Sequence, residues 1–150
     1  NIITQKEIND KIDTFFIDTN IFVYAKLATE KEIEKQHQAK QFLKSQQNTV
    51  VISTQVLSEF TSVLIKHRID DETIKNAIAE ITQDCIVAPV SFNTIQTAWE
   101  IKTRYQFSYW DSVIIASALE NECAILATED LQDNQIIAEK LRVKNPFKFA

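Results

Sequence analysis

The stretch "FFIDTNIFVYA", residues 15–25, places Asp18 and two further polar residues between two strongly apolar runs. The first apolar run predicts a strand over residues 14–18, and the second predicts a helix over residues 20–27. Burying a carboxylate costs free energy unless another group pairs with it. Asp18 therefore needs partners from elsewhere in the chain.

The rest of the chain repeats this alternation of strand and helix. Continuous apolar runs with β-branched residues, typical of strands covered on both faces, lie at 49–53, 86–90, 123–128 and 141–144. Helical spacing of apolar residues is found at 30–47, 55–67, 71–84, 93–105 and 109–121. The pattern predicts an α/β fold, an α/β/α sandwich around a central, mostly parallel sheet of about five strands.

Composition indicates one globular domain spanning residues 1–150, with 45% apolar and 25% charged residues. No apolar run approaches the roughly 20 residues that cross a bilayer, and the first residues lack the features of a secretory signal. Cys85 and Cys123 are interpreted as small core residues. We therefore expect a cytoplasmic protein without membrane contact.

The chain contains no glycine, although average usage predicts roughly ten in this length. Glycine-rich phosphate-binding loops are therefore excluded. Positions with φ > 0 must be taken by other residues, Asn first, and we expect them at Asn121 and Asn134.

Four carboxylates stand out by their context: Asp18, Glu59, Asp111 and Asp130. Two follow predicted strands and two lie near helix starts, so a parallel sheet can bring all four to one edge. Carboxylates that face one another repel, and a hard divalent cation such as Mg²⁺ or Mn²⁺ relieves this repulsion. Such a centre suits metal-assisted hydrolysis of a phosphodiester bond.

Each of these acids also has a simpler interpretation. Asp18 could cap the helix that follows it, and Asp111 could form a capping box with Ser108. Glu59 could lie at the edge of an apolar stripe with its carboxylate in solvent, and Asp130 could belong to a turn. Taken singly, the four residues leave these alternatives open.

Several segments together resemble PIN-domain ribonucleases, and more narrowly the VapC-type toxins of toxin–antitoxin modules. The resemblance rests on "FFIDTNIFVYA", "STQVLSEF", "SYWDSVIIASALE", "ILATEDLQDNQII" and the ending "LRVKNPF", in this order. It covers about residues 14–147 and implies a PIN-like fold. The absence of glycine is a departure from the family, since Asn121 and Asn134 occupy positions where relatives often carry it.

The resemblance also implies roles for individual residues. The catalytic and metal-binding quartet would be Asp18, Glu59, Asp111 and Asp130, holding one or two Mg²⁺ or Mn²⁺ ions. Asn20 and Thr128 match polar helpers that orient carboxylates or waters. Asp133 could bind metal through water or only shape its loop.

The function implied by the resemblance is a Mg²⁺-dependent endoribonuclease that cuts tRNA or rRNA. It would act as a toxin inhibited by a cognate antitoxin and would form a homodimer. Alternatives are an RNA-processing nuclease outside a toxin–antitoxin system and a catalytically silent binding module. An aspartyl-phosphate phosphatase is disfavoured, because the position of its acid–base carboxylate is taken by Asn20.

Basic and aromatic residues are candidate RNA contacts. The net charge of −5 argues against a broad nucleic-acid coat but leaves room for a local basic patch. Phosphate contacts are expected from Lys26, Lys66, Arg68 and Arg104, against the alternative of solvated surface charge. Tyr24, Tyr105 and Trp110 could stack on bases, whereas burial or dimer packing is the other role considered for Trp110.

Overall fold

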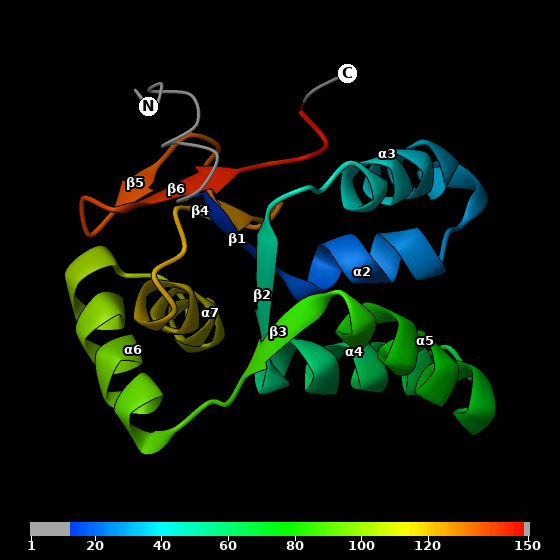
Figure 1. Ribbon diagram of the computed structural model, residues 1–150, viewed down its shortest axis with the longest axis horizontal. Helices are drawn as coiled ribbons and strands as arrows, with labels where there is room; N and C mark the ends of the chain where they lie inside the picture. Colours follow the sequence, from blue (N-terminus) through cyan, green and yellow to red (C-terminus); the bar gives the residue numbers. More distant parts are fainter. Residues whose placement is uncertain (1–12, 149–150) are drawn as a thin grey trace, which may run out of the picture.

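A six-stranded sheet in the order β3-β2-β1-β4-β6-β5 forms the centre of the protein, whose computed structural model describes residues 13–148 (Figure 1). The strands are β1 Thr14–Ile17, β2 Thr49–Ser53, β3 Cys85–Ala88, β4 Ile125–Ala127, β5 Ile136–Ile137 and β6 Leu141–Lys144. All neighbouring pairs are parallel except β5 with β6. The five predicted strands are confirmed, and the two-residue β5 is additional.

Helices cover the sheet on both sides (Figure 1). They are α2 Thr19–Lys26, a 3-10 turn Glu30–Glu32, α3 Ile33–Lys44, α4 Thr54–Lys66, α5 Asp71–Gln83, α6 Phe92–Tyr105 and α7 Tyr109–Glu120. Helices α6 and α7 lie side by side, away from the group formed by α2 to α5. The strand order reverses between β1 and β4, and ligands of open α/β sheets bind at such a switch point.

The parallel pairing of β1 with β4 aligns the two strand ends. Ile17 is paired with Ala127, and the backbone N–H of Asp18 donates to the carbonyl of Ala127 at 3.0 Å. Asp18 and Thr128 are the next residues of the two strands. The sheet register therefore brings together two residues that are far apart in the sequence.

The core is continuous through the sheet, but the β3 edge is not covered as expected. Phe16, Ile52 and Leu126 are fully buried in β1, β2 and β4. Ile86 in β3 is 55% exposed. The expectation that every strand is covered on both faces is therefore wrong for β3, because this strand has a neighbour on one side only.

The turns confirm one of the two asparagine predictions. Asn134 has φ 68°, as expected, but Asn121 is the C-cap of α7 with φ −96°. The left-handed residue after α7 is Glu122, with φ 56°. The amide side chain of Asn121 donates to the carbonyl of Ser117 at 2.8 Å, so Asn121 continues the helix and the reversal occurs one residue later.

The cysteines behave as core residues. Cys123 is buried in the main core, and Cys85 packs against that core. Burial raises the pKa of Cys123 to about 12 and that of Cys85 to about 11, so neither thiol is activated. Among the described residues, no helix combines the length and apolarity needed to cross a membrane.

Candidate functional site

Asp18 directly follows the last residue of β1 and is buried, with 5% of its surface exposed. Its Oδ1 accepts a 2.7 Å hydrogen bond from the backbone N–H of Thr19, which makes it the N-cap of α2. Its Oδ2 accepts a 2.8 Å hydrogen bond from the hydroxyl of Thr128. The predicted helix cap is confirmed, and Asp18 also has a partner from the other end of the chain.

Thr128 connects three polar residues of this edge. Its Oγ1 accepts the backbone N–H of Asp130 at 3.1 Å and the side-chain amide of Asn20 at 3.3 Å. The same amide of Asn20 donates to Oδ2 of Asp130 at 2.9 Å. Asn20 and Thr128 thus contact the carboxylates as expected. The Asn20 Oδ1 is buried and has no hydrogen-bond partner within residues 13–148.

Glu59 reaches the same edge from α4, where two side chains orient its carboxylate. The Thr19 hydroxyl donates to Oε2 at 3.3 Å, and the Gln55 amide donates to Oε1. The Gln55 amide also donates to the carbonyl of Trp110 at 3.3 Å, which ties α4 to the first turn of α7. Gln55 was not singled out from the sequence, although its i, i+4 spacing to Glu59 on a helix is a usable signal.

Asp111 lies half-buried in the first turn of α7. Its backbone N–H donates to the Ser108 side chain at 3.1 Å, so the Ser108 half of the predicted capping box is present. Burial raises the pKa of Asp111, the hydrogen bond with Ser108 opposes this effect, and the charge of Asp130 adds to it. Asp111 is therefore electrostatically coupled to Asp130.

A cavity of about 520 Å³ joins three of the four predicted acids, Asp18, Glu59 and Asp130. Asp111 is not on its wall. Burial raises the pKa of Asp18 to about 7, hydrogen bonds from Thr128 and Thr19 oppose this, and the charges of Asp130 and Glu59 raise it further. Within residues 13–148, none of these carboxylates forms an ion pair.

The chemistry of this cavity fits a hydrated divalent cation. Its acidic donors are all oxygen atoms, which Mg²⁺ and Mn²⁺ prefer. Within the described part of the chain, no three His, Cys, Asp or Glu side chains are close enough to form a ready-made coordination shell. An ion that keeps several waters and contacts one or two carboxylates directly does not need such a shell. The unpartnered Oδ1 of Asn20 offers an acceptor for one of those waters.

Asp133 forms hydrogen bonds that stabilise the loop in which it lies. Its Oδ1 accepts the backbone N–H of Asn145 at 2.9 Å, and its Oδ2 accepts from the Asn134 amide at 3.4 Å. Asp133 is not on the wall of the acidic cavity. Of the two roles left open by the sequence, these contacts favour shaping the loop.

The basic candidates differ in their positions. His67 lines the acidic cavity. Its neighbours in the sequence are Lys66, the last residue of α4, and Arg68, and both are exposed. Lys26 lines a different cavity, and Arg104 lies over the ring of Tyr105 at 4.9 Å. Lys66 and Arg68 are therefore the two candidates that lie next in sequence to a residue of the acidic cavity wall.

The aromatic candidates also differ in their exposure and contacts. Trp110 is 64% exposed, so the prediction of burial is wrong for it. Tyr105 stacks on Phe107 with ring centroids 5.5 Å apart, and its hydroxyl accepts the backbone N–H of Ala138 at 2.8 Å. Tyr24 lines the acidic cavity. Tyr24 and Trp110 are thus better placed for stacking than Tyr105.

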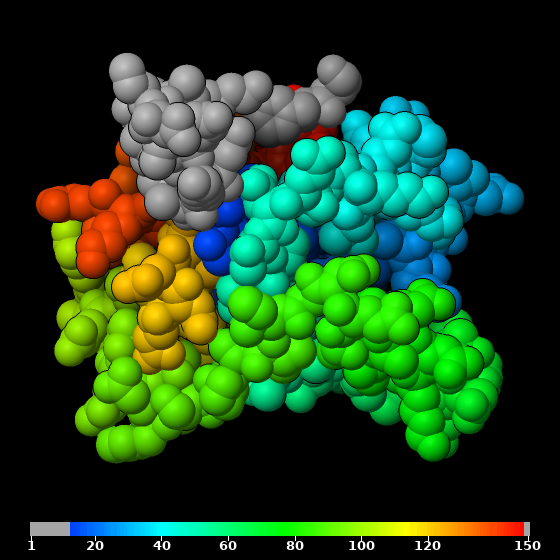
Figure 2. Space-filling view, in the orientation of Figure 1, coloured from blue at the N-terminus to red at the C-terminus, as the bar shows by residue number. Residues whose placement is uncertain are grey.

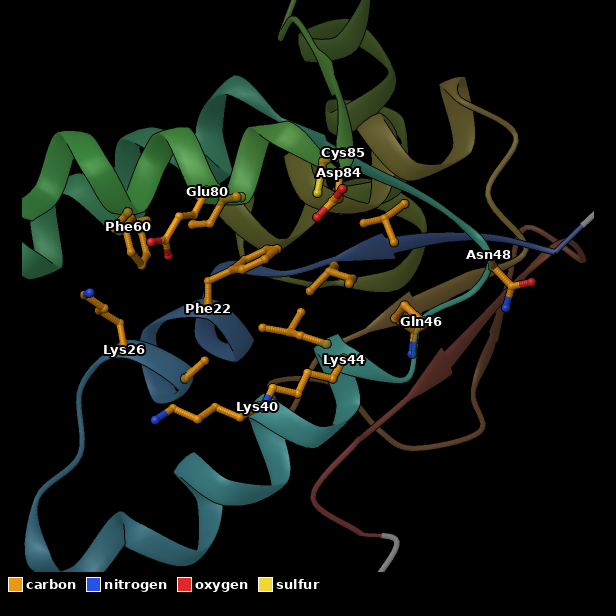
Figure 3. A pocket seen from close by; sticks show the side chains of 16 residues that line it. Phe22, Lys26, Lys40, Lys44, Gln46, Asn48, Phe60, Glu80, Asp84 and Cys85 are labelled. Atoms are coloured by element: carbon orange, nitrogen blue, oxygen red, sulfur yellow. The ribbon is translucent and has the colours of Figure 1, made fainter.

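A second, larger cavity of about 890 Å³ lies on the other side of α2, between α3 and α5. In Figure 2, α3 and α5 stand on either side of a hollow at whose base α2 lies. Figure 3 shows Lys26, Lys40 and Lys44 on one rim, facing Glu80 and Asp84 on the other. Apolar side chains form the floor, among them Phe22, Val50, Phe60, Ala77 and Ile81.

The sequence profile described as "PIN domain" matches residues 15–136. The chain belongs to the PIN domain family. The matched region of the PIN domain contains Asp18, Glu59, Asp111 and Asp130. No curated protein matches the chain at a significant level.

Solved structures share the PIN fold at low sequence identity. VapC20 of Mycobacterium tuberculosis, described as a toxin that cleaves the sarcin–ricin loop, is 21% identical with a TM-score of 0.62, covering 75% of this chain and 86% of that one. A toxin–antitoxin complex from Klebsiella pneumoniae is 18% identical with a TM-score of 0.66, covering 87% and 96%. VapBC2 from Rickettsia felis, bound to a DNA fragment from its promoter, is 20% identical with a TM-score of 0.62, covering 88% and 98%.

Proposed function

We propose that this PIN domain is a Mg²⁺- or Mn²⁺-dependent endoribonuclease that acts as the toxin of a toxin–antitoxin module. The observation that carries the proposal is the acidic cavity, where Asp18, Glu59 and Asp130 meet without an ion pair among the described residues. Acids arranged in this way favour a cation and, through it, a phosphate-containing substrate. The similarity to VapC20 and to VapBC2 supports the assignment to RNA and to a toxin–antitoxin module.

The chain's own residues orient the acids in this proposal. Thr19 and Thr128 hold the two oxygens of Asp18, Gln55 holds Glu59, and Asn20 holds Asp130. One or two bound ions would lower the pKa of a coordinated water and neutralise charge on a phosphoryl oxygen. Asp111 would act through its charge on Asp130, from behind the cavity wall.

RNA contact by Lys66 and Arg68 is supported by their position beside His67. Both side chains are exposed where α4 ends, and His67 between them lines the acidic cavity. Cations at this place can bind backbone phosphates on either side of a scissile bond. Tyr24 on the cavity wall is available to stack on an unpaired base.

The decisive experiment is cleavage of total tRNA and rRNA by the wild-type protein and by Asp18→Asn. We expect cleavage with Mg²⁺ or Mn²⁺, none with EDTA, and a large loss for Asp18→Asn. Asp71→Asn is the matched control, because Asp71 is an exposed acid in the first turn of α5. Absence of cleavage under all conditions would leave the binding-module alternative, and equal cleavage by Asp18→Asn would remove the acidic cavity from the reaction.

An antitoxin partner is supported by the larger cavity. Its apolar floor between a lysine rim and a carboxylate rim is complementary to an amphipathic segment that carries acids on one edge and bases on the other (Figure 3). We propose that the cognate antitoxin supplies this segment. A small reading frame directly upstream that encodes a protein binding this chain would support the proposal, and weaker binding by Lys40→Glu would locate the contact. Cleavage of RNA by this chain, together with the absence of such a reading frame beside its gene, would favour an RNA-processing nuclease.

A homodimer is supported by an exposed aromatic surface on α6 and α7. Trp99 is 55% exposed and lies against Tyr109, whose ring contacts Trp110 at a centroid distance of 5.1 Å. Phe92, at the start of α6, is 74% exposed. Large aromatic side chains are enriched at protein interfaces, and we propose that a second copy of the chain covers this surface.

A further inference from the structure

One group of contacts beside the acidic cavity is not used by the proposed reaction. The ammonium group of Lys35 forms an ion pair with Oε2 of Glu129 at 2.7 Å. The hydroxyl of Tyr24 donates to Oε1 of the same carboxylate at 2.7 Å. Both oxygens of Glu129 are thus occupied by donors from α3 and α2. We call Tyr24, Lys35, Glu129 and Phe147 the Lys35 cluster.

Two aromatic rings complete the Lys35 cluster. The Lys35 ammonium group lies 4.8 Å from the ring centroid of Tyr24 and 5.2 Å from that of Phe147. The two rings meet edge to face with centroids 5.1 Å apart. An isolated surface ion pair contributes little, but a cation held by a carboxylate and two ring faces has a defined position.

The cluster is connected to the acidic site through the backbone. Glu129 lies between Thr128, which donates to Asp18, and Asp130, which accepts from Asn20. Glu129 itself lines the acidic cavity, yet Lys35 and Tyr24 occupy its carboxylate. Tyr24 of α2 and Lys35 of α3 therefore fix Glu129, and Phe147 packs against both of them. The residues on either side of Glu129 both belong to the hydrogen-bonded network of the acidic site.

We propose that Lys35 is a positioning residue for the acidic cavity. By pairing with Glu129, which also accepts from Tyr24, it directs Asp130 toward Asn20 and Asp18 and keeps Glu129 from acting as a ligand. The consequence for metal binding rests on the proposed function. The consequence for the Thr128–Asp130 segment does not, because the hydrogen bonds of that segment exist independently of any ion.

The test compares Lys35→Met with Lys31→Met, which changes an exposed lysine one helical turn earlier in the chain. We expect Lys35→Met to weaken Mn²⁺ binding roughly tenfold, as the loss of groups that orient metal ligands commonly does. We also expect faster hydrogen exchange at the amide of Asp130, whose acceptor is Oγ1 of Thr128. Lys31→Met should change neither quantity, and Lys35→Arg should restore most of both.

A double-mutant cycle with Glu129→Gln separates positioning from direct ligation. If the pair acts as a unit, Lys35→Met and Glu129→Gln each weaken Mn²⁺ binding and the double variant is no worse than either. Unchanged or tighter Mn²⁺ binding by Lys35→Met, together with unchanged exchange at Asp130, would overturn the proposal. If the wild-type chain binds no Mn²⁺, the proposed function fails, and exchange at Asp130 still decides whether Lys35 fixes this segment.

Discussion

The hydroxyl of Thr128 donates a 2.8 Å hydrogen bond to Oδ2 of Asp18, a residue 110 positions earlier in the chain. Asp18 is buried and Thr128 is fully buried, so neither can exchange this bond for one to bulk water. The same Oγ1 of Thr128 accepts the amide of Asp130. One side chain therefore couples two strand ends and two acids.

Replacing Thr128 with valine tests this coupling with little change in shape. We expect the free energy of unfolding to fall by about 1–3 kcal/mol, because a buried carboxylate oxygen loses its donor. The pKa of Asp18 should rise further, since the hydrogen bond from Thr128 lowers it. Urea unfolding and an NMR titration of the carboxyl group measure the two effects. Thr128→Ser keeps the hydroxyl and should retain most of the wild-type values.

The stability of the metal-free protein should depend on pH through Asp18. Its pKa is about 7 in the folded state and 3.8 ordinarily, so the folded state binds the extra proton between these values. Stability is then greatest at low pH and falls as pH rises, by roughly 3 kcal/mol between pH 5 and pH 8. Urea unfolding in EDTA at several pH values measures this slope. If Asp18→Asn shows the same slope as the wild type, Asp18 is not its source.

Gln55 should affect the acidic cavity through Glu59. Gln55→Met retains most of the volume but removes the donor to Glu59 and to the Trp110 carbonyl. We expect Mn²⁺ binding, measured by titration calorimetry, to weaken by about tenfold, because Glu59 loses its fixed orientation. Gln96→Met on α6 is the control, since Gln96 is exposed. An unaltered affinity in Gln55→Met would show that Glu59 is held well enough by Thr19.

The proposed dimer predicts a specific effect of Trp99. Trp99→Glu should shift the chain from dimer to monomer in light scattering at a fixed concentration, because a charge would be buried in the contact. Ile33→Glu is the matched control, since Ile33 on α3 is 59% exposed and lies outside the aromatic surface. A wild-type chain that is monomeric at high concentration would contradict the proposal directly.

Replacing Glu122 with glycine should stabilise the folded protein. Glu122 follows α7 with φ 56°, a conformation that costs a residue with a Cβ about 1 kcal/mol. We expect Glu122→Gly to raise the free energy of unfolding by about 0.5–1 kcal/mol, measured by urea unfolding. Asn121→Gly should lower it, because Asn121 has φ −96° and bonds to Ser117.

The sequence predicted best those site residues whose position depends only on the arrangement of the strands. Asp18 and Asp130 follow parallel strands, so strand assignment was enough to place them at one edge. Asp111, in the first turn of α7, is not on the cavity wall, although the charges of Asp111 and Asp130 interact. The spacing of residues does not determine which side chains line a cavity.

Other features depend on side-chain packing that sequence patterns do not record. Burial, one of the two packing roles considered for Trp110, is wrong, because Trp110 in the first turn of α7 is 64% exposed. The two-residue strand β5 carries too few apolar residues to give an alternating pattern. Lys35 contacts Glu129, 94 residues away on another element, and Gln55 contacts the carbonyl of Trp110, 55 residues away. Such pairs become visible only when the elements are packed.

The pairing of β1 with β4 also sets the order in which the acidic cavity can form during synthesis. Asp18 is translated 110 residues before Thr128, and Asp130 follows Thr128. Until then β1 can pair with β2 alone, and Asp18 lacks the donor that holds its second oxygen. A nascent chain that ends before β4 therefore cannot assemble this cavity, and the site is completed only when the segment containing Thr128 and Asp130 is available to fold.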